Sequence, residues 1–225
     1  NRYVDRDIDK ENPRTAIREI PAGIIKSSSA LAFVIVSSVL FVTSCYFINT
    51  ICLYLSPIAL VVILGYSYSK RFTFLSHMIL GVGLALAPIG AYLAVTGVFA
   101  WTPLLISFAV LFWVSGFDII YALQDIEFDK SHDLRSFPVK LGQRGALLLS
   151  SIFHILTAIF IFAAGYYGGF GIWYWIGCAI FSALLIYQHT LVKVDDLSKI
   201  NMAFFTTNGI GSVVFALFVI LDLTL

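Results

Sequence analysis

The sequence predicts an all-α membrane protein, a multi-span bundle with seven transmembrane helices, and three observations support this fold class. First, 60% of its 225 residues are hydrophobic and only 12% are charged, whereas soluble domains carry about 25% charged residues. Second, the apolar residues form runs of about 20, the length that crosses a bilayer. Third, the runs lack the alternation of a membrane β-barrel, so helices are the remaining spanning structure.

Seven apolar segments qualify as membrane spans, and short breaks separate them. They cover residues 29–48, 51–68, 75–97, 101–121, 145–166, 171–191 and 202–222. The breaks at Asn49-Thr50, at Thr96-Gly97 and from Gly165 to Gly171 fit tight turns, because small and polar residues favour such turns. We therefore expect neighbouring spans to run antiparallel.

The basic residues lie on one side of the predicted bundle. All 14 Lys and Arg residues occur before the first span or in every second connection, while the intervening connections contain none. By the positive-inside rule, the basic connections face the cytoplasm. The acidic residues follow the same distribution, with Asp222 the exception on the opposite side. The charged chemistry of this protein is thus predicted at its cytoplasmic boundary.

Two acidic segments at this boundary have helical spacing. Asn1, Asp5 and Asp9 are four residues apart and would share one face of a helix. At the end of the 101–121 span, three acids again share a face with a tyrosine close to it, and these residues are Asp118, Tyr121, Asp125 and Asp129. Stacked carboxylates repel one another. Two such clusters at one membrane boundary therefore indicate a bound cation.

Hard oxygen ligands favour Mg²⁺ or Ca²⁺, and Mg²⁺ characteristically binds through one or two carboxylates plus substrate phosphates. Basic side chains that could clamp a phosphate accompany the acids, and these are Arg14, Arg18, Lys70, Arg71, Lys130, Arg135 and Lys140. A polar mouth above an apolar bundle suits an amphiphile with a diphosphate head and a hydrocarbon tail.

Simpler interpretations exist for each feature taken alone. Mixed acidic and basic loops are commonly solvated surfaces, and Lys70 with Arg71 could anchor a helix at the membrane boundary. His77 and His154 are interpreted as hydrogen-bonded helix contacts rather than ligands. His132 follows the second acidic segment and is a further candidate.

These motifs together resemble the UbiA superfamily of membrane prenyltransferases, and the resemblance covers nearly the whole chain. The first family signature is Asn-Asp-x-x-Asp-x-x-x-Asp followed by Arg-Thr, matched by Asn1, Asp5, Asp9 and Arg14-Thr15, with Arg2 replacing the first Asp. The second is Asp-x-x-Tyr-x-x-x-Asp-x-x-x-Asp, matched by Asp118, Tyr121, Asp125 and Asp129. A Tyr-x-x-x-Lys-Arg stretch between them is matched by Tyr66, Lys70 and Arg71.

The resemblance implies Mg²⁺-dependent transfer of a polyprenyl group from a polyprenyl diphosphate to an aromatic acid. The implied metal ligands are Asn1, Asp5 and Asp9 for one ion and Asp125 and Asp129 for a second. The implied catalytic residues are Asp118, Tyr121, Asp125, Lys70 and Arg71. The implied substrate-binding residues are Tyr66, Arg14, Lys130 and Arg135.

The family has nine spans, with the first signature after the second span, whereas this chain begins at that signature. We therefore expect residues 1–225 to form a single transmembrane prenyltransferase domain that lacks about two N-terminal spans. By the same resemblance, the protein is expected in the bacterial inner membrane with its active site facing the cytoplasm. Its expected partners are the two substrates and the lipid bilayer, with no nucleic acid.

The resemblance leaves two acceptors open, both in quinone biosynthesis. The segment Asp5–Asp9 and the pair Arg14-Thr15 look most like 4-hydroxybenzoate polyprenyltransferases, which serve ubiquinone synthesis. Residues 12–15 and 18–23 are similar to relatives in the futalosine route to menaquinone, where the acceptor is a dihydroxynaphthoate. Haem O and chlorophyll synthases share the fold and are alternatives.

Other membrane protein classes fit the sequence less well. CDP-alcohol phosphotransferases need Asp-Gly and Ala-Arg pairs that this sequence lacks. An ion-coupled transporter would place carboxylates near the bilayer midplane, whereas here the acids gather at one boundary. A structural membrane subunit leaves the two acidic segments unexplained.

Overall fold

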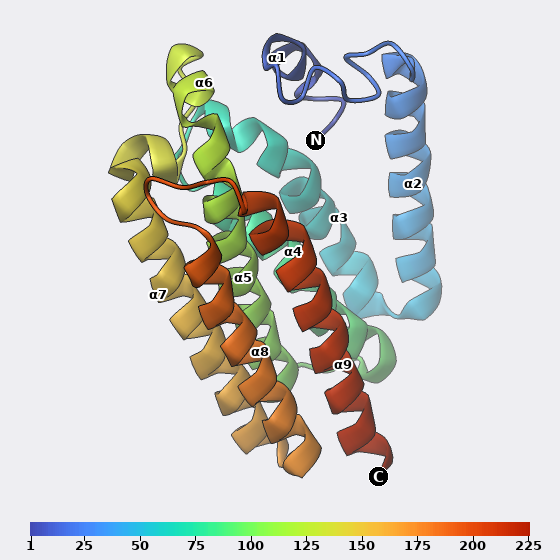
Figure 1. Cartoon of the computed structure of the whole chain (residues 1–225). Helices are drawn as coiled ribbons and strands as arrows, with labels where there is room; N and C mark the ends of the chain where they lie inside the picture. Colours follow the sequence, from blue (N-terminus) through green and yellow to red (C-terminus); the bar gives the residue numbers. More distant parts are fainter.

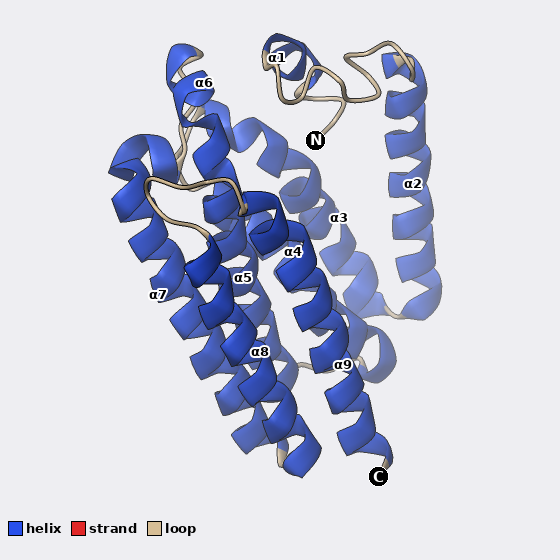
Figure 2. Cartoon of the chain, in the orientation of Figure 1, coloured by secondary structure: helices blue, strands red, loops and turns tan.

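The computed structural model describes residues 1–225 and contains helices and connecting segments without β-strands. Seven helices are long and apolar enough to cross a membrane, which confirms the predicted fold class and the number of spans. They run side by side along one direction, with short connections at both ends (Figures 1 and 2). The short helices α1 and α6 lie at one end of this bundle, together with the N-terminus (Figure 1).

The spanning helices are connected by polar segments and by short 3₁₀ or π turns. In chain order the elements are α1 (Arg6–Glu11), α2 (Ser27–Ile48), α3 (Thr50–Gly65), η1 (Tyr66–Arg71), α4 (Ser76–Thr96), α5 (Trp101–Ala122), η2 (Leu123–Asp125), α6 (Ile126–Ser131), α7 (Phe137–Gly168), α8 (Ile172–Leu191), η3 (Met202–Thr207) and α9 (Asn208–Thr224).

Helix α7 begins eight residues before the predicted 145–166 span. Ser136 caps its N-terminus by accepting a hydrogen bond from the Val139 amide, and Pro138 stands in its first turn, where a missing amide hydrogen costs nothing. Gly142 then kinks the helix with a φ of 69°, a left-handed conformation that glycine adopts without strain. Hydropathy detected only the apolar part of α7, because its first turns contain Lys140 and Arg144.

Helix α5 is the centre of the bundle and packs against α4 and α7. Small residues allow these close approaches, as is typical between membrane helices. A Cβ on Gly116 would lie 2.5 Å from His154 Nε2, so this glycine lets α7 approach α5. Ser150 of α7 also donates a hydrogen bond of 2.7 Å to the Gly116 carbonyl. These contacts fix the depth at which the polar end of α5 emerges from the bundle.

Helix α2 lies at the edge of the bundle and packs mainly against α3 (Figure 1). Cys45 is its single buried residue, and apolar side chains occur on all its sides. Such a helix would be insoluble in water, but lipid is an apolar solvent that accepts it. Exposure of apolar residues here is therefore expected of a membrane protein.

Asp222 of α9 caps the N-terminus of α8 at the end of the bundle away from α1. Its Oδ2 accepts a hydrogen bond of 2.7 Å from the Gly171 amide, and its Oδ1 accepts one of 3.2 Å from the Tyr174 amide. These two amides have no partner within their own helix. The isolated acid of the opposite side thus joins two spans and is unrelated to the acidic segments.

Candidate active site

One polar cavity of about 200 Å³ lies at the end of the bundle that carries α1 and α6. Residues from α1, its following loop, η1, the start of α4 and the end of α5 through α6 line it. Most predicted site residues face this cavity, and they are Asn1, Asp5, Asp9, Arg14, Tyr66, Lys70, Arg71, Asp118, Tyr121, Asp125 and Asp129. Side chains more than 100 positions apart in the sequence therefore form one site.

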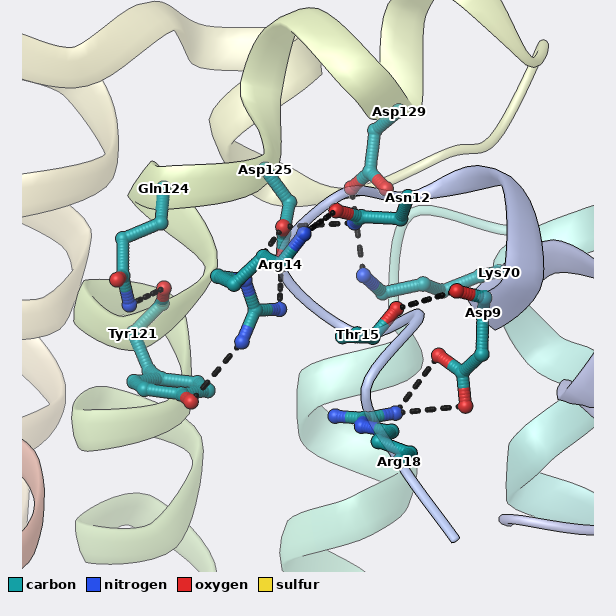
Figure 3. Close-up of polar contacts among 10 residues, drawn as sticks. All are labelled: Asp9, Asn12, Arg14, Thr15, Arg18, Lys70, Tyr121, Gln124, Asp125 and Asp129. Atoms are coloured by element: carbon teal, nitrogen blue, oxygen red, sulfur yellow. Dashed lines mark hydrogen bonds and ion pairs between the residues drawn. The ribbon is translucent and has the colours of Figure 1, made fainter. Parts of the chain in front are cut away.

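Asp9 is buried and is paired with Arg18. Arg18 Nη1 donates to both carboxylate oxygens of Asp9, at 2.7 and 2.8 Å. Thr15 Oγ1 donates to the Asp9 carbonyl at 3.1 Å, so the loop after α1 folds back onto the helix. Figure 3 shows the Arg18 guanidinium directed at the Asp9 carboxylate.

Asp125 belongs to the second acidic segment and is paired with Arg14, a residue of the N-terminal loop. Arg14 binds the carboxylate through two nitrogens, with its Nε at 2.9 Å from Oδ1 and its Nη2 bonded to Oδ2. Asn12 Nδ2 donates to the same Oδ1 at 3.1 Å. Such fork-like pairing fixes orientation as well as charge, so it joins the loop after the first acidic segment to the second acidic segment (Figure 3).

The remaining two predicted carboxylate ligands face the basic pair of η1. Lys70 Nζ donates to Asp129 Oδ2 at 3.3 Å, and Asp129 is almost fully buried. Arg71 Nη2 lies 3.7 Å from Asp5 Oδ1 and donates to the Val4 carbonyl at 3.1 Å. The 3₁₀ helix η1 carries both basic side chains, so each of the four carboxylates predicted as metal ligands has a cation nearby.

Protonation of the N-terminal part of the site is shaped by burial and by charged neighbours. Burial, together with the nearby Asp9 carboxylate, raises the pKa of the Asp5 carboxyl above its ordinary value. Burial lowers the pKa of the Arg14 guanidinium, but the bonds from Asp125 outweigh that effect and the net shift is upward. Asp5 is thus a carboxylate that gains from an additional cation, while Arg14 stays charged.

Tyr121 joins the deep wall of the cavity to the N-terminal loop. Its hydroxyl accepts a hydrogen bond of 3.0 Å from Arg14 Nη1, and the guanidinium also stands over its ring at 5.1 Å. The opposite ring face stacks on Phe204, with centroids 4.0 Å apart. The phenol is therefore held in one orientation at the boundary between the polar cavity and the apolar bundle.

The structure does not bring Lys130 and Arg135 into the cavity. Lys130 points away along α6 and forms an exposed ion pair with Glu127 at 3.4 Å. Arg135 Nη1 donates to the Phe72 carbonyl at 2.7 Å and fastens the loop before α7 to the end of η1. Spacing in the sequence grouped Lys130 with Asp129, but adjacent helix residues point in different directions.

Further polar side chains face the cavity, among them Arg18, which the sequence had grouped with the basic side chains that could clamp a phosphate. Asn12, Thr15 and Arg18 lie in the loop after α1, and His77 is in the first turn of α4. Asn12, Thr15 and Arg18 closely follow the first acidic motif, and this position in the sequence indicates that they belong to the site. The interpretation of His77 as a hydrogen-bonded helix contact is confirmed, because its Nδ1 on α4 lies 2.7 Å from Asp118 Oδ2 on α5, and both residues line the cavity.

The Mg²⁺ site expected from the sequence can be tested against these donors. No three Asp, Glu, His or Cys side chains are grouped closely enough to hold a metal ion by themselves. The protein instead offers hard oxygen ligands in small sets on two sides of the cavity. Mg²⁺ typically takes one or two carboxylates and completes its shell with water and substrate phosphates. The donor set therefore fits a metal that arrives with a diphosphate.

Comparison with known proteins gives a consistent result. The UbiA prenyltransferase family model matches residues 1–210. A 4-hydroxybenzoate octaprenyltransferase of Paraburkholderia phymatum is 30% identical over 219 residues, covering 96% of this chain and 75% of that protein. One from Aeromonas salmonicida is 27% identical over 215 residues, covering 96% of this chain and 74% of that protein.

Two solved structures share the fold. The apo structure of a UbiA homolog from Aeropyrum pernix K1 aligns with a TM-score of 0.88 and 31% identity, over 99% of this chain and 82% of that chain. A structure of digeranylgeranylglyceryl phosphate synthase aligns with a TM-score of 0.73 and 24% identity, over 98% of this chain and 78% of that chain. The family match extends over both acidic segments and the cavity between them, and the chain therefore belongs to the UbiA prenyltransferase family and is a membrane-embedded prenyltransferase.

Proposed function

We propose that this protein transfers a polyprenyl group from a polyprenyl diphosphate to an aromatic acid in a Mg²⁺-dependent reaction. The observation that carries the proposal is the convergence of two acidic segments and four basic side chains on one cavity, at the polar end of an apolar bundle. The acidic and basic side chains of the cavity would hold a diphosphate, and the apolar bundle would hold a polyprenyl tail. The family supplies the reaction class.

Two sets of oxygen ligands would hold the metal. Asn1, Asp5 and Asp9 form the first set, and Asp125 with Asp129 forms the second. Mg²⁺ held by these residues would supply positive charge that offsets the negative charge developing on the diphosphate as it leaves. Burial, and to a smaller extent the Asp9 carboxylate, raises the pKa of the Asp5 carboxyl, so a bound cation would stabilise its ionised form.

Four cations would bind the diphosphate directly, and these are Arg14, Arg18, Lys70 and Arg71. Arg14 is bonded to the Asp125 carboxylate, and the other three each lie 2.7–3.7 Å from a carboxylate oxygen. Lys70 and Arg71 belong to η1, whereas Arg14 and Arg18 belong to the loop after α1, and all four line the cavity. Charged donors that surround the leaving oxygen stabilise it more in the transition state than in the ground state, which is the requirement for catalysis.

The transfer itself is an electrophilic substitution on the acceptor ring. The allylic carbon–oxygen bond breaks and its electron pair leaves with the diphosphate. Electrons of the aromatic ring then form the new carbon–carbon bond to the prenyl carbon. Asp118 and Tyr121 lie on the deep wall of the cavity, where the apolar bundle begins, and Asp118 would accept the ring proton. The surrounding lipid-facing helices keep water from the carbocation.

The acceptor is proposed as 4-hydroxybenzoate, with a dihydroxynaphthoate as the second candidate. Several relatives from bacteria are named as 4-hydroxybenzoate octaprenyltransferases, and the N-terminal segments that resemble menaquinone enzymes favour the second acid. Both acids carry a carboxylate and a phenolic hydroxyl, so the cationic rim of the cavity suits either one. The pathway is therefore ubiquinone or menaquinone synthesis.

The distribution of basic residues supports a cytoplasmic position for the cavity, in a bacterial inner membrane. The basic connections all occur at the end of the bundle that carries α1 and α6. The positive-inside rule then orients that end toward the cytoplasm. Both substrates' polar groups would enter from this side, and the polyprenyl tail would extend between helices toward lipid.

The test is a product assay in membranes that contain the protein. Wild type and Asp5→Ala are incubated with a polyprenyl diphosphate and each acceptor, with Mg²⁺ or with EDTA. We expect wild-type product with Mg²⁺ only, and little product from Asp5→Ala. Product that persists in EDTA would remove the metal from the mechanism. Absence of product with both acids would reject the proposed acceptor class.

A further inference from the structure

His77 and Asp118 form a carboxylate–imidazole pair in the deep wall of the cavity. Their closest atoms, His77 Nδ1 and Asp118 Oδ2, are 2.7 Å apart. Both residues line the cavity, but the Asp118 side chain is 23% exposed, whereas the His77 side chain is only 1% exposed. Asp118 is therefore the member of the pair that can contact a substrate, and His77 would act through Asp118.

The direction of the hydrogen bond follows from the chemistry of the two groups. An ionised carboxylate only accepts hydrogen bonds, so Nδ1 of His77 must donate. His77 is the only hydrogen-bond partner that the protein gives Asp118. Ring stacking on Phe137, at 5.9 Å between centroids, holds the imidazole from its other side. The Asp118 carboxylate is consequently fixed through Oδ2.

The other ring nitrogen shows that this contact has a cost in stability. His77 Nε2 is fully buried and has no hydrogen-bond partner. A buried polar atom without a partner destabilises a fold, and such atoms are uncommon and call for an explanation. A leucine would fill the same space without that cost. The hydrogen bond to Asp118 is therefore the one polar interaction that the His77 ring makes.

A close helix contact sets the register that brings the pair together. Gly81 lies one turn after His77, and a Cβ at this position would come within 2.5 Å of the Leu111 carbonyl on α5. Ser115, one turn before Asp118, donates to the His77 carbonyl at 3.2 Å. Helices α4 and α5 are thus in contact along this stretch, and the positions of His77 and Asp118 are set by the backbone.

We propose that His77 is a positioning residue for the base of the reaction: its hydrogen bond keeps the Asp118 carboxylate aimed at the acceptor ring. This inference rests on the proposed function. After the new carbon–carbon bond forms, the ring carbon still carries its hydrogen. Asp118 takes that hydrogen as a proton, and the electron pair of the carbon–hydrogen bond restores the aromatic ring. Without His77, the carboxylate loses its hydrogen-bond donor and its fixed orientation.

The test is a kinetic isotope effect on proton removal. Initial rates are measured in membranes with 4-hydroxybenzoate and with the same acid deuterated at the two ring carbons beside the hydroxyl. If wild type prenylates only a dihydroxynaphthoate, that acid is used with deuterium at its prenylated carbon. In His77→Leu we expect a rate loss of roughly tenfold or more and an isotope effect larger than that of wild type, because proton removal becomes slower.

Two further variants separate positioning from folding. His77→Asn keeps a donor close to the place of Nδ1, so its isotope effect and rate should return toward wild type. His154→Leu removes another buried membrane histidine, one that contacts His189 at 2.8 Å outside the cavity. It should lower the amount of folded protein without changing the isotope effect.

The outcomes distinguish this role from the proposed function. A rate loss in His77→Leu with an unchanged isotope effect, or an equal loss in His77→Asn, would overturn the positioning role alone. Absence of product from wild type with both acceptors would overturn the proposed function and this role with it. A larger isotope effect in His77→Leu, rescued in His77→Asn, would support both.

Discussion

Arg14 binds the Asp125 carboxylate through two guanidinium nitrogens, although the two residues are 111 positions apart in the sequence. The pair joins the loop after the first acidic segment to η2, which directly follows α5, so the two signatures of the family are in direct contact. The N-terminal segment has few apolar contacts of its own, and this ion pair is a main connection to the bundle. Its geometry therefore controls whether the two halves of the site meet.

Arg14→Lys keeps the positive charge but loses the fork that matches a carboxylate. We expect a destabilisation of the N-terminal segment by about 1–2 kcal/mol, seen as faster amide hydrogen exchange in residues 1–26, and a fall in prenyl transfer. Arg2→Lys is the control, because Arg2 forms an exposed pair with Glu19. Equal exchange in Arg14→Lys and wild type would contradict this role.

Lys70 lies four residues after Tyr66, and Lys130 directly follows Asp129, but only Lys70 lines the cavity. Lys70→Met removes a cation from the cavity, and we expect a rate loss of roughly 100-fold at saturating acceptor, comparable to loss of one donor in an oxyanion site. Lys130→Met should stay within about twofold of wild type, because exposed ion pairs contribute little. Similar losses in both variants would show that the leaving diphosphate also reaches α6.

Asp5→Asn should increase the Mg²⁺ concentration needed for half-maximal activity by roughly tenfold or more, as loss of metal-site groups commonly does. The measurement is a Mg²⁺ titration of the initial rate in membranes. Asp7→Asn is a matched control, since Asp7 lies two positions away, is 82% exposed and does not line the cavity. An unchanged Mg²⁺ requirement in Asp5→Asn would remove this residue from the ligand set.

Gly81→Ala would place a methyl group against the Leu111 carbonyl and the Ser115 hydroxyl. We expect a stability loss of about 1–3 kcal/mol, measured as a lower thermal midpoint in detergent, and a loss of activity, because His77 moves away from Asp118. Gly90→Ala in the same helix meets no atom within 4 Å. It should leave both quantities close to their wild-type values.

Asp222→Ala removes the cap of α8 at the end of the bundle away from the cavity. Loss of a helix cap costs about 1 kcal/mol, so the thermal midpoint should fall while prenyl transfer at low temperature stays intact. Purified protein in detergent gives the first value and membranes give the second. A loss of activity without a loss of stability would mean that Asp222 affects the reaction itself.

The spans and the two acidic segments were predictable because both are local patterns. A run of apolar residues identifies a membrane helix directly, and spacing of four puts Asp5 and Asp9 on one face. The distribution of charged residues along the chain also predicted that both acidic segments lie on the same side of the membrane. The structure agrees with the predicted spans, with the largest difference at α7, where the polar first turns before residue 145 were not recognised as helix.

The contacts that complete the site depend on packing between distant segments. Lys130 follows Asp129 directly, yet the two point in different directions on α6, and only Lys70 of η1 reaches Asp129. His77 meets Asp118 because α4 and α5 approach closely in one register. Sequence spacing gives no information on such a register between helices.

The pairing of each acid with a base has a consequence for the order of events in a catalytic cycle. Asp9, Asp125 and Asp129 each hold an internal counter-ion, so a lone metal ion competes with arginine or lysine and a lone diphosphate competes with carboxylates. Under the proposed function, a metal ion and a diphosphate that arrive together would let each paired acid and base exchange one partner for another. Such a double exchange would make binding of the metal and the diphosphate cooperative.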